Sequence, residues 1–248
     1  MADVARLAGV SNQTVSRVLH DSPHVRGATR ERVLAAIRQL DYRPNSMAQA
    51  LASGRSRTLG VVSFDTTLFG PASTLLGIEQ AAHDAGYAVS VSSLRSLARD
   101  TVLAAIQQLL DQGVDGVAVI APIRAGTDAL RHVRPDFPVV AVEAGPNASI
   151  PVATVEQRAG AAAATRHLLD LGHVTVWHLA GPADWMDAEE RIEGWRSELE
   201  AADAPVPTLL RGDWTPRSGY ELGQTLLELP ELTAVLVAND QMALGLLR

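Results

Sequence analysis

The chain has 248 residues, 47% of them hydrophobic, a net charge of −7 and no cysteine. This composition is typical of a globular protein, and it excludes disulfide scaffolds and thiol chemistry. No apolar run approaches the roughly 20 residues of a membrane span. The charge is divided unevenly: residues 1–57 carry nine Arg against four acids, net +5, and residues 58–248 carry twelve Arg against twenty-four acids, net −12. A basic arm on an acidic body predicts phosphate binding at one end only.

The start of the chain predicts two short helices joined by a tight turn. Val4, Leu7 and Ala8 give the first helix one apolar face. Gly9 ends that helix, and Ser11 can cap the next one by accepting hydrogen bonds from backbone N–H groups. The second helix is predicted to bury Val15, Val18 and Leu19.

The polar face of the second helix predicts contacts with DNA bases. Gln13 and Arg17 are four residues apart, so they share one face of the helix. Their amide and guanidinium groups suit base edges in a major groove, where Gln pairs with adenine and Arg with guanine. A small solvated helical hairpin would carry the same pattern, so this segment alone leaves both interpretations open. The predicted DNA contacts are Ser11, Asn12, Gln13, Thr14, Ser16 and Arg17.

A third helix is predicted from Thr29 to Leu40, because apolar residues recur there at helical spacing. The three helices would form an all-α headpiece over residues 1–44. The predicted buried stripe of the third helix is Val33, Leu34, Ile37 and Leu40.

Three longer motifs span residues 3–52. They are Asp-Val-Ala-x-x-Ala-Gly-Val-Ser, Thr-Val-Ser-Arg-Val-Leu and Tyr-x-Pro-Asn-x-x-Ala-x-x-Leu. Together they resemble the DNA-binding headpiece and hinge helix of the lactose-repressor/galactose-repressor family of bacterial transcription regulators. The resemblance implies a hinge helix and linker over residues 45–57, with Asn45 at the DNA and Leu51 wedged between base steps in the minor groove. An ordinary core leucine is the alternative for Leu51.

Beyond residue 57, short β-branched runs alternate with longer helical segments, which predicts parallel sheets covered on both faces. The order repeats after about residue 155, so we expect two subdomains, residues 58–155 and 156–248, with a ligand between them near the strand carboxyl ends. The predicted strands are 58–63, 88–92, 116–120, 139–142, 175–179 and 234–237. The predicted helices are 72–85, 100–112, 127–133, 157–171, 187–202 and 218–227.

Several motifs of this body resemble the family's sugar-binding core, among them Val-Val-Ala-Val-Glu, Arg-x-x-Gly-Trp, Gly-Asp-Trp and Ala-Asn-Asp-Gln-Met. That core is similar to periplasmic sugar-binding proteins. The expected fold is therefore an all-α helix-turn-helix headpiece plus an α/β periplasmic-binding-protein-like core of two parallel-sheet subdomains. Family members continue beyond the position of Arg248, so we expect an incomplete second subdomain, in either a shortened gene product or a fragment.

The resemblance also implies an effector cleft. Arg191 and Asn239 match residues that hydrogen-bond sugar hydroxyls, and Trp214 matches an aromatic ring that stacks on the sugar. Glu143 stands where the family often has Asp. A few convergent polar groups beside an aromatic wall suit a polyol. The implied ligand contacts are Leu68, Gly70, Pro71, Glu143, Arg191, Trp214 and Asn239.

Three of these residues have structural alternatives. Arg191 could pair with Glu190 or Glu193 on a solvated helix. Trp214 could simply plug a loop. Asn239 could cap the helix that follows it, alone or in addition to binding a ligand.

Enzymatic function is not predicted. The chain has no glycine-rich phosphate loop and no Gly-x-Ser-x-Gly elbow. His167, His173 and His178 lack the spacing of a compact metal site, so neither a metal nor a cofactor is expected. A cluster of acidic residues is predicted to be a solvated face favoured by the helix dipole, rather than a pair of catalytic carboxylates. The cluster comprises Asp184, Asp187, Glu189, Glu190 and Glu193.

We therefore expect a cytoplasmic, nucleoid-associated transcriptional regulator, a repressor that binds a palindromic operator as a homodimer. A small sugar, galactoside-like or other, would bind between the subdomains and change DNA affinity through their closure. Two alternatives remain: a sugar-binding module without DNA function, and a shortened regulator that cannot respond to an effector. No membrane partner is expected.

Overall fold

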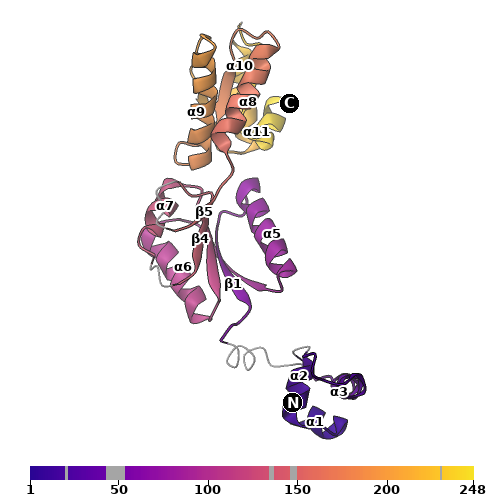
Figure 1. Ribbon diagram of the computed structural model, residues 1–248. Coiled ribbons are helices and arrows are strands. Elements are labelled where there is room, and N and C mark those ends of the chain that lie inside the picture. Colours follow the sequence, from indigo (N-terminus) through magenta and orange to yellow (C-terminus); the bar gives the residue numbers. More distant parts are fainter. Residues whose placement is uncertain (20–21, 43–53, 134–136, 146–149, 230) are drawn as a thin grey trace. The chain divides into compact units, whose positions relative to one another are not determined.

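The computed structural model describes residues 1–19, 22–42, 54–133, 137–145, 150–229 and 231–248. These residues form two compact units, divided between Ser56 and Arg57 (Figure 1). The predicted DNA contacts Asn45 and Leu51 lie outside the described residues, as does most of the predicted hinge segment.

The described part of the first unit consists of α1 (Ala2–Ala8), α2 (Asn12–Leu19) and α3 (Gly27–Gln39). Gly9 ends α1 with a φ of 63°, a left-handed backbone angle that glycine adopts without steric cost. The Ser11 hydroxyl accepts a hydrogen bond from the backbone N–H of Thr14 at 3.2 Å. The predicted turn and the predicted cap of α2 are both confirmed.

The core of the first unit is made of smaller side chains than predicted. Leu7, Leu34 and Leu40 were expected to be buried, but they are 47%, 38% and 43% exposed. Short helices pack closely where alanines meet. The prediction included Ala8 and missed Ala5 and Ala36, which are buried where it expected larger side chains. The residues buried together are Val4, Ala5, Ala8, Val15, Val18, Val33 and Ala36.

The second unit contains two parallel sheets. The first has the strand order β2-β1-β3-β4-β5, with α5 on one face and α6 and α7 on the other (Figure 1). Its strands are β1 (Thr58–Phe64), β2 (Ala88–Leu94), β3 (Gly116–Ile120), β4 (Val139–Val142) and β5 (Val152–Ala153). Its helices are α5 (Phe69–Asp84), α6 (Arg99–Asp111) and α7 (Arg124–Leu130).

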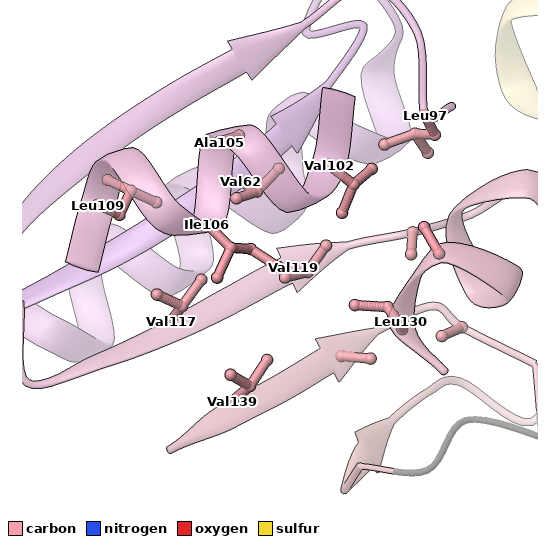
Figure 2. Close-up of a cluster of buried hydrophobic side chains, with 14 of the residues drawn as sticks. Val62, Leu97, Val102, Ala105, Ile106, Leu109, Val117, Val119, Leu130 and Val139 are labelled. Atoms are coloured by element: carbon pink, nitrogen blue, oxygen red, sulfur yellow. The ribbon is translucent and has the colours of Figure 1, made fainter. Parts of the chain in front are cut away.

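The main apolar core lies between α6 and this sheet, as Figure 2 shows. Ile106 and Leu109 of α6 lie against Val117 and Val119 of β3, and none of the four is more than 5% exposed. Helices on both faces leave a parallel strand no solvated side. This explains why β1 is apolar without alternation and is buried from Gly60 to Ser63.

The second sheet has the order β7-β6-β8, also parallel. It comprises β6 (Trp177–Ala180), β7 (Leu210–Arg211) and β8 (Val235–Val237), with α8 (Gln157–Asp170), α9 (Met186–Ala201), α10 (Pro216–Leu227) and α11 (Asp240–Leu246). The predicted strands and helices are present within a few residues of their expected bounds. The two-residue strands β5 and β7 were not predicted, because so short a run has no period. No helix in the described part of the chain is long and apolar enough to cross a membrane.

Glycines bring two pairs of helices into backbone contact beside the second sheet. A Cβ on Gly194 of α9 would lie 2.2 Å from the carbonyl oxygen of Arg158 in α8. A Cβ on Gly245 of α11 would lie 1.9 Å from the carbonyl oxygen of Pro216 in α10. Neither distance leaves room for a side chain, so α8 and α9, and likewise α10 and α11, are in backbone contact at these glycines.

Candidate functional site

A cavity of about 380 Å³ in the second unit is lined by residues that follow strands of both sheets. In parallel sheets the carboxyl ends of the strands meet at one edge, which is where open α/β folds bind ligands. The structure brings all seven predicted ligand contacts to this cavity: Leu68, Gly70, Pro71, Glu143, Arg191, Trp214 and Asn239. The prediction did not include eight further polar or aromatic residues of the described lining. They are Phe69, Ser73, Thr74, Gln157, Trp185, Asp187, Asp240 and Gln241.

One wall of the cleft is aromatic. The ring centroids of Trp214 and Trp185 lie 5.4 Å apart with their planes at 74°, an edge-to-face arrangement. The ring of Phe64, which is not among the described lining residues, lies 6.3 Å from that of Trp185 and supports it from the side of the first sheet's core. Trp214 is only 8% exposed, and its ring lies so close to Gly181 that a Cβ there would come within 2.0 Å of it. Trp214 therefore packs firmly against the protein while it also lines the cleft.

Arg191 extends from α9 into the cleft. Its Nε donates to Oε1 of Gln157 at 2.8 Å, and its Nη1 donates to the carbonyl oxygen of Ala238 at 2.6 Å. Its Cζ lies 5.7 Å from the centroid of the Trp214 ring, within reach of a cation–π attraction. The alternative of a solvated Arg191 is wrong, because the side chain is 24% exposed and its ion pair is with Asp187, at 3.8 Å.

Asp187 lies one helical turn before Arg191. Its side chain is 15% exposed and accepts a hydrogen bond from Nε2 of Gln157 at 2.9 Å. Burial, reinforced by the nearby charge of Glu143, raises the pKa of Asp187 to about 6. The prediction of a solvated acidic face is wrong here, because the first turn of α9 faces the cleft. The spacing of four residues from Arg191 was a signal that could have placed Asp187 on the same face.

Glu189, a second member of the predicted solvated face, is half-buried. Its side chain is 28% exposed and forms an ion pair with Arg211 at 2.8 Å. Arg211 belongs to β7, a strand that the sequence did not predict, so this partner could not be expected either.

Glu143 and Asn239 are both bonded to neighbouring elements. Glu143 has a φ of 60°, and its Oε1 accepts a hydrogen bond from the Thr74 hydroxyl of α5 at 2.7 Å. Asn239 caps α11 as predicted, because its Oδ1 accepts from the backbone N–H of Met242 at 2.9 Å. Its Nδ2 donates to the carbonyl oxygen of Trp214 at 3.1 Å. An amide has capacity for further hydrogen bonds, so this arrangement still allows a ligand contact.

We expect Asp187→Asn to raise the free energy of unfolding by about 2 kcal/mol at pH 7.5 and to change it little at pH 4. The folded-state pKa of about 6 lies above the ordinary value of 3.8, so the fold disfavours the carboxylate. That penalty is absent below about pH 4, grows as the pH rises through the folded-state pKa, and is full above it. The difference between the two pKa values corresponds to about 3 kcal/mol. The expected effect is smaller, about 2 kcal/mol, because the Asp187 side chain keeps some contact with solvent.

Urea denaturation at the two pH values measures this effect. Asp184→Asn is the matched control, because Asp184 is exposed at the same end of α9. A gain that is equal at both pH values, or a loss at pH 7.5, would contradict the assignment of a buried carboxylate.

The six predicted DNA contacts that the structure describes lie at the turn and on α2. Ser11, Asn12, Gln13 and Arg17 are exposed, whereas Thr14 and Ser16 are half-buried. Since Gln13 and Arg17 are four residues apart on α2 and both exposed, they present one outward polar face, as predicted. Buried Val15 and Val18 anchor the opposite face in the core.

Comparisons with known proteins agree over both units. Residues 1–45 match the model of bacterial regulatory proteins of the lacI family, and residues 60–248 match periplasmic binding proteins and the sugar binding domain of the LacI family. The lactose operon repressor of Escherichia coli (strain K12) is 35% identical over 250 residues, which cover 99% of this chain and 69% of the repressor. Catabolite control protein A of Priestia megaterium is 33% identical over 254 residues, which cover 99% of this chain and 75% of that protein.

A solved structure is similarly close. The crystal structure of the lac repressor dimer bound to operator and the anti-inducer ONPF matches with a TM-score of 0.85 and 34% identity, covering 99% of this chain and 75% of that chain. The match thus extends over both the helical unit and the α/β unit. The chain belongs to the lacI family of bacterial regulatory proteins, and it is a DNA-binding transcriptional regulator with a sugar-binding type of core.

Proposed function

We propose that this regulator is a repressor that binds a palindromic operator as a homodimer and changes its DNA affinity when a small sugar binds in the cleft. The observation that carries the proposal is the cleft itself. Seven residues taken from five separate stretches of sequence line one cavity, together with an aromatic wall and hydrogen-bonding groups. Such a combination orients a polyol.

Each part of the chain has a role in this proposal. Residues 1–44 read the operator, residues 45–57 form the hinge and linker with Leu51 in the minor groove, and residues 58–155 and 156–248 enclose the effector. The solved relative supports it, because that repressor is a dimer on its operator with an anti-inducer. A sugar that binds more tightly when the two subdomains are closed, or when they are open, would shift the protein towards that state. It would thereby change the affinity for DNA, and DNA would change the affinity for the sugar to the same degree. The regulator would work in the cytoplasm, at the nucleoid.

Selection of bound sequences from a random duplex pool by this 248-residue chain, at near-physiological salt, tests the DNA part. We expect a palindrome of two half-sites, because a two-fold dimer presents two copies of α2. Recovery of unrelated sequences held only at low salt would contradict a base-reading dimer. Titration of sugars against the selected operator then tests the effector part, and a complex that no sugar alters would identify a regulator without this response.

We expect Arg17→Ala to weaken binding to the selected operator by about 1–3 kcal/mol, because the lost guanidinium would read a base edge. The fold should not change, since Arg17 is exposed. Arg38→Ala is the matched control: it removes the same charge from an exposed position on α3. Fluorescence anisotropy on the operator and on random duplex measures both variants. An equal loss on random duplex would place Arg17 on a phosphate instead.

A further inference from the structure

The charges around the cleft are unbalanced. Among the described residues that line it, three carry a carboxylate and one carries a cation: Glu143, Asp187 and Asp240 against Arg191. When all four are ionised, their formal charges leave the cleft at −2. A neutral sugar needs no such imbalance, and an anionic one would be repelled by it.

Arg191 is partly committed to acceptors of the protein itself. Two of its nitrogens donate to Gln157 and to the carbonyl oxygen of Ala238, and its third lies 3.8 Å from Asp187. A guanidinium that recognises a phosphate or carboxylate usually presents two parallel N–H groups to it. Here Nε and Nη1 each already donate to an acceptor of the protein, and Asp187 partly balances the charge, so the only cation of the described lining also supports the cleft wall.

One helix start at the cleft, that of α11, is also already matched with an acceptor. Asn239 caps α11, and Asp240 follows in its first turn. The N-terminal half of α5 faces the carboxylate of Glu143 through the Thr74 hydroxyl. At the start of α11, the backbone N–H of Met242, which could otherwise attract an anion, therefore meets a side-chain oxygen of this chain.

The two inner carboxylates, in contrast, lack a full counterion. Asp187 and Glu143 line the same cavity. The charge of Glu143 disfavours that of Asp187, and the raised pKa of Asp187 reflects a burial that Arg191 does not offset. A ligand cation in the cavity beside both carboxylates would relieve the repulsion on Asp187. An ammonium group is the simplest such cation that a sugar carries, since it replaces one hydroxyl with three donors.

We propose that the effector is an amino sugar, or another polyol bearing one ammonium group, held by Asp187 and Glu143. This inference rests on the proposed function, because it specifies the ligand class of the same cleft. Within a matched series, an amino sugar binds about tenfold more tightly than its uncharged parent, and the corresponding sugar acid binds at least tenfold more weakly than that parent.

Calorimetric titration of the full chain at pH 7.5 tests the proposal with two series: galactosamine, galactose and galacturonate, and glucosamine, glucose and glucuronate. We expect the order amine, neutral, acid in each series that binds. Equal affinities, or a preference for the acid, would overturn the ammonium inference and leave the sugar cleft intact. If no member of either series binds, the proposed sugar response is overturned with it.

Two variants assign the preference to its residues. Asp187→Asn and Glu143→Gln keep side chains of the same shape, and each is expected to reduce the ratio of amine to acid affinity about tenfold. Asp184→Asn removes an exposed charge near the same end of α9 and should leave the ratio unchanged. If Asp184→Asn reduces the ratio as much as the other two variants, the preference comes from the net charge of the unit, and the assignment to the cleft is wrong.

Discussion

Gly194→Ala is expected to lower the free energy of unfolding of this regulator by about 3 kcal/mol. Extra atoms in a tightly packed contact usually cost about 1–3 kcal/mol. The upper end applies here, because the new Cβ would meet the backbone carbonyl of Arg158 at 2.2 Å, and a backbone cannot rotate aside. Helices α8 and α9 would have to separate, and Trp195, which is next in sequence and fully buried, would move with them.

The same helix pair supplies the control. Gly160 lies on α8, and a Cβ there would meet nothing within 4 Å. Gly160→Ala should therefore stabilise the chain by about 1 kcal/mol, the ordinary advantage of alanine over glycine in a helix. Urea unfolding followed by circular dichroism measures both variants. If Gly194→Ala also stabilises the chain, the two helices do not pack as closely as described.

Trp214→Ala is expected to cost about 3–5 kcal/mol of stability and to remove the response of operator binding to sugar. The stability loss follows from burial, because Trp214 packs with Leu179, Ala188 and Met242. The loss of response follows from the proposed stacking of the ring on the ligand. Operator affinity itself should persist while the variant remains folded, because the proposed DNA contacts lie in the other compact unit.

Trp195→Ala separates these two effects. Trp195 is fully buried in a different cluster, and its Nε1 donates to the carbonyl oxygen of Val176 at 2.7 Å. It is not among the described residues that line the cleft. Both variants should unfold more easily, and only Trp214→Ala should lose the sugar response in operator titrations at low temperature. A normal response in Trp214→Ala would remove this ring from the ligand site.

The gross architecture could be predicted because it depends on local patterns. Strand and helix alternation follows from β-branched runs and helical spacing, and the carboxyl ends of parallel strands necessarily share one edge. Glu143 and Asn239 each follow a strand, so their meeting at one cleft was within reach of the sequence. The family motifs then indicated which of the residues at that edge to choose.

The burial of individual side chains could not be predicted in the same way. Asp187 reads as an ordinary acidic residue in the first turn of a helix, and only the approach of Gln157 and Glu143, distant in sequence, shows that it is enclosed. Leu7 is exposed because the contact between short helices is made by alanine instead. In both cases the deciding quantity is the distance between elements, which no local pattern contains.

The amide of Asn239 has a consequence for how ligand specificity can change in such a protein. It supports two pieces of backbone at once, the start of α11 and the loop at Trp214. A substitution of Asn239 would disturb these two backbone segments whether or not a sugar is present. The residue type at this position therefore carries little information about which effector the protein binds. In the described contacts Asp187 bonds only to side chains, so it can be exchanged without loosening any backbone. The cleft thus combines Asn239, which the fold requires, with Asp187, at which a substitution could change the effector that the protein binds.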